Sequence, residues 1–339
     1  MTQIARRALL LGAACLPTLA PRARAAEPVR LKLAFFGPDS EMTYVTTLKP
    51  FADAVNKDGA GLVQIDTYPN GALGRSLPNQ PQMVLDAVAD IAFAIPGNTP
   101  GRFPDDVVVE LPGVFQDLRE ATLAWTRLLA TEDLRGFKDY VVLGALGTAP
   151  FGIHTRAPIK TLADLRGMKI RTTNATEGTA LRALGVVPVL LPINEVAEAV
   201  GRGTIDGTTV HPVPMFDFGL NRVTRYDYFI RLGISPLVVL MNRQKFEDLP
   251  KEAQAVITAH SGEAMAKVYI AGYGGYSDGL TGKLKADTTR HVIMPTPQDE
   301  AAAQAEFKPL INDYRAKDPR NAQLYDKLQA IITQIRAQG

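Results

Sequence analysis

The stretch from Gly167 to Pro212 constrains the fold more than any other part of the chain, because strand and helix patterns alternate along it. The predicted order is a strand ending at Arg171, a helix over about 175–184, a strand over 187–190, a helix from Ile193 and a strand ending at His211. Such alternation is typical of a parallel sheet, which places ligands at the carboxyl ends of its strands. Arg171 and His211 would then face one crevice, which we predict to bind a carboxylate.

The first third of the chain shows the same alternation. The predicted strands cover residues 29–36, 62–68 and 91–95, and the predicted helices cover 41–57 and 80–89. Pro50 should bend or restart the first helix, because proline has no N–H to donate. Right-handed crossovers would join these strands into a parallel sheet. With 339 residues, the chain is long enough for two such α/β domains.

The first 26 residues have the organisation of an export signal. Arg6 and Arg7 precede a short apolar run, and Ala23-Arg24-Ala25 offers a small-x-small cleavage site. The paired arginines leave both the general and the twin-arginine export routes open. The alternative is a frayed or buried N-terminal helix. We predict a signal peptide over residues 1–26 and a periplasmic product.

Charge and cysteine content exclude several classes of protein. The chain has 37 basic and 35 acidic residues, and removal of the predicted signal deletes four arginines and no acid, which leaves 33 against 35. A net charge near −2 gives no indication of nucleic-acid or anionic-membrane binding. The only cysteine, Cys15, lies in the signal, so we expect no disulfide in the mature chain. After residue 26 no apolar run is long enough to cross a bilayer.

A series of short motifs follows in a fixed order through the chain. The first half contains Tyr68-Pro69-Asn70-Gly71-Ala72-Leu73-Gly74, Asp90-Ile91-Ala92-Phe93, Arg102-Phe103-Pro104 and Glu110-Leu111-Pro112-Gly113-Val114-Phe115. The second half contains Asp164-Leu165-Arg166-Gly167-Met168-Lys169-Ile170-Arg171, Asn194-Glu195-Val196, Ile205-Asp206-Gly207, His211-Pro212, Asn242-Arg243 and Leu249-Pro250. In order and spacing, the mature chain resembles the substrate-binding proteins of tripartite ATP-independent periplasmic (TRAP) transporters, the dicarboxylate-binding-protein-like family.

The resemblance implies two α/β lobes around a cleft, each with a mostly parallel sheet flanked by helices. On this basis we expect lobe 1 to contain residues 27–149 and about 236–280, and lobe 2 to contain 150–235 and about 281–339. A proline-free helical pattern over 251–285 would supply a long helix spanning both lobes. Two amphipathic segments after Gln298 would pack outside the sheets.

Arginine is suited to a carboxylate ligand because its planar guanidinium donates two parallel hydrogen bonds and keeps its charge. From spacing alone, Arg171 could equally form an ion pair on the surface. The resemblance implies a ligand-binding role, since family members hold the ligand carboxylate with an arginine at this place in the pattern.

Asn174 and His211 are the next candidate ligand-binding residues. Asn174 can serve as a helix N-cap, and the resemblance implies that its amide contacts the ligand beside Arg171. His211 falls where family members often carry asparagine. Its imidazole could bond a carboxylate or hydroxyl, and its protonation could make affinity depend on pH.

Phe151 marks a departure from the pattern of the family. Many acid-binding members carry a further cationic residue where the chain enters the second lobe, and by spacing from Arg171 that place is Phe151. An aromatic residue there suggests a ligand with one carboxylate and an apolar or aromatic body. Alternatively, Phe151 belongs to the core and the correspondence slips towards His154 or Arg156.

In the first lobe, four residues follow strand ends or turns and could line the cleft, although each could equally serve packing or the surface. They are Phe36, Phe93, Asn98 and Arg75. Glu110 and Asp206 are expected to order loops at strand ends.

The sequence offers weaker alternatives to a binding protein. Gly275-Tyr276-Ser277-Asp278-Gly279 matches the nucleophile motif of hydrolases, but it lies in a helical pattern rather than between a strand and a helix. None of the four histidines belongs to a metal-ligand cluster, and Gly201-Arg202-Gly203 ends a helix instead of opening one. We therefore expect no catalytic residue, metal or cofactor.

The sequence thus predicts an exported TRAP solute-binding protein that captures an organic acid by cleft closure. Its partners would be a carboxylate ligand and the small and large membrane subunits of the permease. Phe151 suggests that the ligand is a monocarboxylate, which could be aromatic. We expect a monomer. A secreted hydrolase using Ser277 and a protein that presents its ligand to a sensor kinase stay as alternatives.

Overall fold

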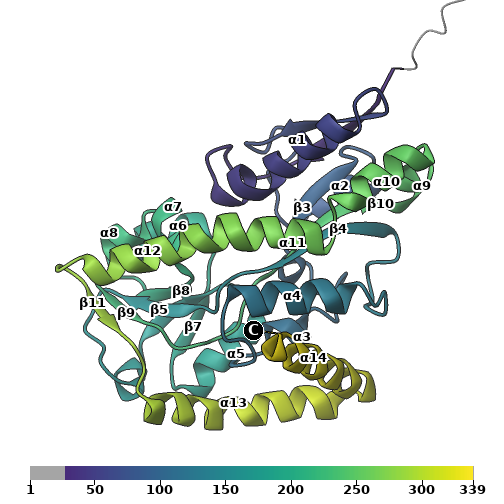
Figure 1. Cartoon of the computed structure of the whole chain (residues 1–339). Helices are drawn as coiled ribbons and strands as arrows, with labels where there is room; N and C mark the ends of the chain where they lie inside the picture. Colours follow the sequence, from purple (N-terminus) through teal and green to yellow (C-terminus); the bar gives the residue numbers. More distant parts are fainter. Residues whose placement is uncertain (1–26, 339) are drawn as a thin grey trace, which may run out of the picture.

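The computed structural model describes residues 27–338 and arranges them around two β-sheets connected by a long helix (Figure 1). The predicted signal peptide, residues 1–26, lies outside the described residues. The first sheet has the strand order β2-β1-β3-β10-β4, and the second has the order β11-β9-β5-β8-β6-β7. Helices flank both sheets, which confirms the predicted two-lobed α/β class.

The first sheet is mostly parallel. Its strands are β2 (Val63–Tyr68), β1 (Val29–Ala34), β3 (Ile91–Ala94), β10 (Pro236–Asn242) and β4 (Tyr140–Gly147). β1 pairs in parallel with β2 and β3, whereas β10 runs antiparallel to β3 and β4. Along β3, Ile91 and Phe93 face one core cluster while Ala92 and Ala94 face another. This period-two division shows that both faces of the sheet are covered.

The second sheet is built in the same way around one reversed strand. Its strands are β11 (His291–Ile293), β9 (Tyr226–Tyr228), β5 (Gly152–Thr155), β8 (Gly207–Val210), β6 (Lys169–Thr172) and β7 (Val187–Leu190). β6 pairs in parallel with β7 and β8, and β5 is antiparallel to β8 and β9. The predicted βαβαβ unit is therefore present, and the carboxyl ends of β6 and β8 lie at one edge.

Two extended segments connect the lobes side by side. The segment after β4 and the segment before β10 exchange backbone hydrogen bonds: the Phe151 N–H donates to the Gly233 carbonyl at 3.0 Å, and the Leu232 N–H donates to the Phe151 carbonyl at 3.2 Å. At the first-lobe end, the Thr148 N–H donates to the Ser235 carbonyl at 3.2 Å. The connection is thus a short antiparallel pair, which fixes the neighbouring strands β5 and β10 as the reversed ones.

The helices divide between the two sheets. Beside the first sheet lie α1 (Lys49–Asp58), α2 (Gln80–Leu85), α3 (Val107–Glu110), α4 (Leu118–Leu129), α9 (Arg243–Glu247) and α10 (Lys251–Ala259), and beside the second lie α5 (Ala175–Ala183), α6 (Ile193–Arg202), α7 (Pro212–Asp217) and α8 (Leu220–Val223). Short turns are η1 (Tyr44–Leu48), η2 (Pro96–Asn98) and η3 (Leu162–Leu165).

The first helix is irregular directly before Pro50. The turn directly before it, η1, is a π turn in which the Lys49 N–H donates to the Tyr44 carbonyl. A wider turn of this kind is one way for a helix to continue past a residue that lacks a donor. The helix is therefore adjusted at the predicted place and then continues as α1.

The helix that spans both lobes begins later than the sequence pattern indicated. α10 ends at Ala259, and Gly262, at a φ of +59°, separates it from α11 (Glu263–Tyr269). From Glu263 the helix runs through α11, the π turn η4 (Ile270–Gly274) and α12 (Gly275–Ala286). α11 and η4 contact α4 and η1 of the first lobe, and α12 contacts α7 and β11 of the second. Figure 1 shows this helix crossing the molecule beside both sheets.

The two C-terminal helices pack in different places. α13 (Pro297–Lys317) contacts α5, but α14 (Pro319–Ala337) returns to α4 and α3. Its buried residues, Leu324, Leu328, Ile332 and Ile335, share a core cluster with first-lobe residues. Its ion pairs, Arg320–Asp105 at 2.7 Å and Arg336–Glu120 at 2.7 Å, also lead to the first lobe. We had expected all residues after about 281 to belong to lobe 2.

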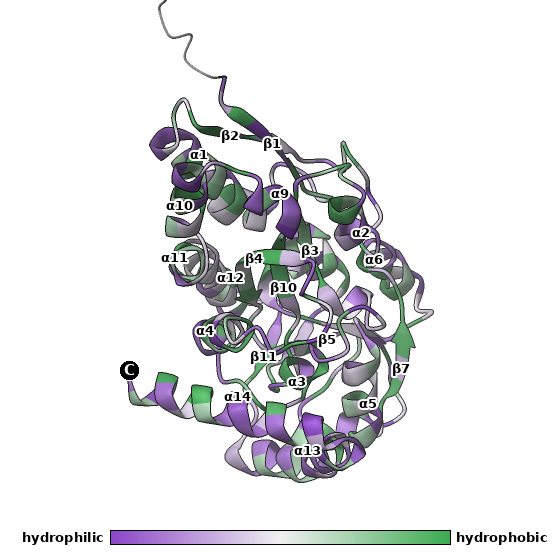
Figure 2. Cartoon of the chain, turned by 90° about the vertical axis from the view of Figure 1, so that its right-hand side faces the viewer, coloured by the Kyte–Doolittle hydropathy of each residue, from purple (hydrophilic) through white to green (hydrophobic). Residues whose placement is uncertain are grey.

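The reason for this difference lies in the helix pattern itself. Figure 2 shows hydrophilic and hydrophobic residues alternating along α14, as expected for an amphipathic helix at the surface. Such a pattern predicts a buried stripe but does not identify the surface that covers it.

Among the described residues, no helix is both long and apolar enough to span a membrane.

We predict that Gly147→Ala destabilises the protein. A Cβ at this position at the end of β4 would lie 2.8 Å from the Ala121 carbonyl carbon, where α4 crosses closely. Overpacking of this kind costs roughly 1–3 kcal/mol of unfolding free energy, measurable by urea denaturation. The control is Gly282→Ala, which is exposed on α12 with open space around it and should stabilise the protein by up to about 1 kcal/mol. Equal effects of the two changes would contradict the prediction.

Candidate functional site

Arg171 is a buried cation at the carboxyl end of β6. Its residue exposure is only 5%. Nε donates to the Leu191 carbonyl at 2.8 Å, and Nη1 donates to Thr173 Oγ1 at 3.1 Å and approaches the Thr209 carbonyl at 3.4 Å. Burial lowers the pKa of the guanidinium, and Glu177 partly opposes this effect. The groups that hold the guanidinium are therefore neutral, and within residues 27–338 Arg171 forms no ion pair.

Glu177 is the acid whose charge acts on Arg171, but its carboxylate is engaged elsewhere. Oε2 accepts hydrogen bonds from Thr172 Oγ1 at 2.9 Å and from the Thr173 N–H at 2.7 Å. Glu177 thus orders the first turn of α5 instead of neutralising Arg171 directly. A cation held by carbonyls and a hydroxyl, without its own carboxylate, has the chemistry of an anion site.

Asn174 lies close to Arg171 in the sequence, and both polar atoms of its amide have partners within the protein. Oδ1 accepts from the Glu177 N–H at 2.8 Å and so caps α5, as the N-cap interpretation expected. Nδ2 donates to Glu110 Oε1 at 3.2 Å. Its contact with a ligand stays a prediction.

His211 follows β8 and begins α7, at the same edge of the sheet as Arg171. Its ring stacks on Phe151 with centroids 5.9 Å apart and lies 6.1 Å from the ring of Tyr273. Burial, and secondarily His154, lowers its pKa to about 3. The imidazole is therefore neutral over the physiological range. Within this structure, its protonation cannot supply the pH-dependent affinity that we had considered.

Phe151 is a core residue and also lies next to a candidate ligand-binding residue, so it fits both interpretations of its sequence position. It is buried within the core of the second lobe beside Ile153 and Tyr228, and one face of its ring covers His211. The alternative residue His154 is wholly buried and is engaged with Asp227 in a structural network.

The four first-lobe candidates are placed differently from one another. Phe36 and Phe93 pack together with ring centroids 5.9 Å apart, in a group with Phe35 and Tyr44. Asn98 is half-buried in η2, next to Gly97, which lies against the Glu110 carboxyl group. Arg75 is exposed. The structure therefore brings Arg171, Asn174, His211 and Phe151 together, places the two phenylalanines in the first core and leaves Arg75 at the surface.

Two functional candidates that sequence reasoning missed come from the spanning helix. Tyr269 and Tyr273 are buried, and their rings stack at 4.8 Å. Their spacing of four residues places them on one face of the helix. That spacing is readable in the sequence, but it does not identify which residues of the two lobes face the helix.

Glu110 is a third residue that the sequence did not mark as part of the site. It lies on α3, in the first lobe. Its carboxyl group accepts hydrogen bonds from Asn174 Nδ2 at 3.2 Å and from Thr176 Oγ1 at 3.0 Å, and both donors lie at the start of α5 in the second lobe. Burial, followed by the charge of Asp106, raises its pKa to about 8, although the bond from Thr176 opposes the rise. The Glu110 carboxyl group therefore bridges the lobes, and it is mainly protonated at neutral pH.

A second buried polar network supports the strand that ends at His211. His154 Nδ1 lies 2.8 Å from Asp227 Oδ1, and its Nε2 lies 3.0 Å from the Val210 carbonyl. Arg290 pairs with the same carboxylate at 2.7 Å. Burial alone would raise the pKa of Asp227, but the hydrogen bonds from His154 and Arg290 lower it below its ordinary value. Both imidazole nitrogens lie within hydrogen-bond distance of a partner, which holds the ring at both ends and fixes the backbone next to His211.

The hydrolase alternative is not supported by the surroundings of Ser277. This residue is buried within α12, one of three helical stretches that follow one another without a strand between them. A nucleophile elbow requires a strand before the serine. His260 pairs with Asp58 in the first lobe, and His291 stacks on Tyr226 in the second. In the described part of the chain, no group of three or more metal-ligating side chains is assembled.

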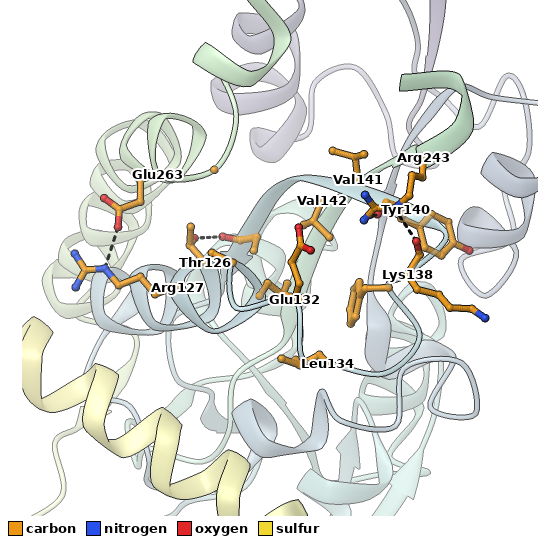
Figure 3. Close-up of a pocket in the computed structure, with 15 residues that line it drawn as sticks. Thr126, Arg127, Glu132, Leu134, Lys138, Tyr140, Val141, Val142, Arg243 and Glu263 are labelled. Carbon is orange, nitrogen blue, oxygen red and sulfur yellow. Dashed lines mark hydrogen bonds and ion pairs between the residues drawn. The ribbon is translucent and has the colours of Figure 1, made fainter. Parts of the chain in front are cut away.

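The hollow drawn in Figure 3 lies away from this site. It has a volume of about 490 Å³ and is bordered by α4, the loop after α4, β4 and Arg243. Arg127 and Glu263 form an ion pair of 2.9 Å at one side of it. It opens beside the edge strand of the first sheet and contains none of the predicted ligand-binding residues.

Comparison with known proteins identifies the family. The model of the family described as bacterial extracellular solute-binding protein, family 7 (DctP) matches residues 36–318. The chain belongs to this family. The C4-dicarboxylate-binding periplasmic protein DctP of Rhodobacter capsulatus is 27% identical over 253 residues, which cover 72% of this chain and 74% of that protein. Members of the DctP family are solute-binding components of TRAP transporters rather than enzymes, and they act with a membrane permease.

Two solved structures of the family resemble this chain closely in fold. A TRAP solute-binding protein from a marine metagenome, described as specific for aromatic acids and crystallised with 3-hydroxybenzoate, has a TM-score of 0.84 and 29% identity, and the match covers 91% of this chain and 99% of that one. A TRAP solute-binding protein from Rhodoferax ferrireducens T118, in complex with copurified benzoate, has a TM-score of 0.80 and 25% identity, covering 90% and 98%. The predicted family and fold are thus confirmed.

We predict that Glu110→Gln makes the protein less sensitive to alkaline pH. The folded-state pKa of Glu110, about 8, lies above its ordinary value of 4.5, so the folded protein binds this proton more tightly than the unfolded chain. The contribution of Glu110 to stability is therefore complete below about pH 4.5 and is lost as pH rises towards 8. The substituted amide cannot ionise, and its carbonyl can still accept a hydrogen bond.

The measurement is the melting temperature from pH 5 to 9. The wild type should lose at least roughly 2 °C more than Glu110→Gln over this range. Glu306→Gln, which changes an exposed carboxylate on α13, is the control and should follow the wild type. Parallel curves for all three proteins would show that Glu110 is not protonated in the folded state.

We predict that Asp227→Asn destabilises the protein strongly. The change leaves the buried guanidinium of Arg290 without its carboxylate and removes the hydrogen-bond partner of His154, a loss that typically costs about 3–5 kcal/mol. Asp66→Asn, which breaks the exposed pair with Arg30, is the control and should cost at most about 1 kcal/mol. Urea denaturation at pH 7 measures both. Similar costs for the two variants would rule out a charged buried network.

Proposed function

We propose that this DctP-family protein binds a monocarboxylate with an aromatic body and delivers it to the small and large membrane subunits of a TRAP permease. The predicted signal would export it to the periplasm, where it would act as a monomer. The four core clusters bury most apolar side chains of the described residues, and those that stay exposed, such as Val45, Leu190 and Met294, are spread over different elements. This distribution supports the monomer.

The observation that carries the proposal is the buried guanidinium of Arg171. Its hydrogen-bond partners are neutral, and burial disfavours its charge. A ligand carboxylate would restore the missing negative charge in a site with little water, where a charge-assisted hydrogen bond contributes roughly 1.5–3 kcal/mol. A single cation at the edge formed by β6 and β8 favours one carboxylate rather than two.

The ligand body is inferred from the side chains beside Arg171. Phe151, His211 and Tyr273 form a row of rings, and His211 is neutral, so these rings offer aromatic faces without a charge of their own. Aromatic ligands pack well on such surfaces. The ligands of the two solved relatives, 3-hydroxybenzoate and benzoate, are aromatic monocarboxylates and support the same choice.

Capture would use closure of the two lobes around the antiparallel connection. Phe151 and Gly233 lie in this connection, and the Glu110 bridge to α5 would form as the lobes meet. Binding would then involve hinge motion without covalent chemistry.

We predict that Arg171→Met abolishes most of the affinity for benzoate. Loss of the charge-assisted bonds should weaken binding by at least roughly tenfold, measured by isothermal titration calorimetry. The matched control is Lys169→Met, which removes the same charge from an exposed position on the same strand and should bind as the wild type does. Benzamide, the uncharged analogue, should give no thermal stabilisation of the wild type. Equal stabilisation by benzamide and benzoate, or full affinity in Arg171→Met, would contradict the proposal.

A further inference from the structure

Four aromatic rings form a continuous row that begins beside Arg171. Phe151 stacks on His211 at 5.9 Å, His211 lies 6.1 Å from Tyr273, and Tyr273 stacks on Tyr269 at 4.8 Å. Arg171 Nη1 approaches the carbonyl of Thr209, two residues before His211, so the cation lies near the chain segment that carries His211. Tyr269 lies at the other end, on the spanning helix.

Two buried polar atoms on this row have no hydrogen-bond partner among residues 27–338. They are His211 Nδ1 and the Tyr269 hydroxyl oxygen, and Tyr269 is fully buried. Buried polar side chains in native proteins are nearly always hydrogen-bonded, and an exception calls for an explanation. A ligand that forms hydrogen bonds with these two atoms would provide the explanation, because the row of rings starts at the proposed position of the ligand carboxylate.

The chemistry of these two atoms limits which kind of ligand group could bond to them. Burial, and secondarily the Glu41 carboxylate, hold the pKa of Tyr269 well above its ordinary value, so its phenol stays neutral. His211 is neutral as well. A neutral phenol can donate or accept one hydrogen bond, which suits a hydroxyl group. A second carboxylate would be disfavoured there, because Tyr269 is fully buried and an ionised carboxylate loses its hydration on burial.

We infer that Tyr269 is a specificity-determining residue whose hydroxyl bonds a hydroxyl group on the ring of the ligand, so that the site selects hydroxylated aromatic monocarboxylates. The carboxylate lies at Arg171, with His211 Nδ1 beside it, and the ring lies along His211 and Tyr273. This inference rests on the proposed function and adds to it the group that distinguishes the preferred acid from benzoate.

The experiment compares three acids by isothermal titration calorimetry: benzoate, 3-hydroxybenzoate and isophthalate, which carries a carboxylate in place of the hydroxyl. The wild type should bind 3-hydroxybenzoate at least about fivefold more tightly than benzoate, because the hydroxyl pairs an otherwise unpaired buried group. Isophthalate should bind more weakly than benzoate. Tyr269→Phe should lose most of the preference for 3-hydroxybenzoate over benzoate.

Tyr228→Phe is the matched control. It removes another buried phenol hydroxyl, from the core of the second lobe on β9, where Asp299 lies near it. It should leave the preference for 3-hydroxybenzoate unchanged. Because the Tyr269 hydroxyl has no hydrogen-bond partner among the described residues, Tyr269→Phe should melt within a few degrees of the wild type.

The outcomes separate this inference from the proposed function. If benzoate binds the wild type and the added hydroxyl gives no gain, or if Tyr269→Phe keeps the full preference, the inference is wrong while the proposed function stands. Tighter binding of isophthalate than of 3-hydroxybenzoate would also overturn it. If no acid in the series binds the wild type, the proposed function fails together with the inference.

Discussion

The site depends on the removal of one guanidinium from water without a carboxylate to accompany it. Arg171 is held by the carbonyl of Leu191 and the hydroxyl of Thr173, which fix its direction but do not neutralise it. A buried charge of this kind is unfavourable unless an opposite charge approaches. Under the proposed function, a ligand carboxylate would offset the unfavourable burial of the Arg171 charge. This gain would add to the affinity, because the guanidinium is already fixed in place before the ligand binds.

The remaining elements hold the first lobe against the part of the second lobe that contains Arg171. Two neighbouring chain segments, the spanning helix and the passage from α13 to α14 connect the lobes, so a rotation of the lobes would take place about these connections without separating them. Glu110 adds a polar contact between α3 and α5, and its protonated form can meet the amide of Asn174 without placing a further negative charge near Arg171. An ionised Glu110 would compete electrostatically with the ligand for the same cation.

The sequence predicted the elements around Arg171 closely, because their apolar periods are short and clearly bounded. β7 covers the predicted residues 187–190, and α5 begins at the predicted position because Asn174 caps it. It did not predict where α14 packs, since an amphipathic stripe contains no information about its partner. It also placed the start of the spanning helix too early, because a single left-handed glycine, Gly262, interrupts a pattern that is otherwise free of breaks.

The site was predictable where residues follow the strands and was not predictable where a distant element completes it. Arg171 and His211 could be found because both end parallel strands of one sheet, and topology alone brings such positions together. Tyr269 and Tyr273 approach from a helix that belongs to neither sheet, so their nearness to His211 depends on how two lobes and the spanning helix are assembled. The position of the proposed carboxylate-binding cation is therefore encoded locally, whereas the groups that would discriminate among acids are brought to it only by the assembled fold.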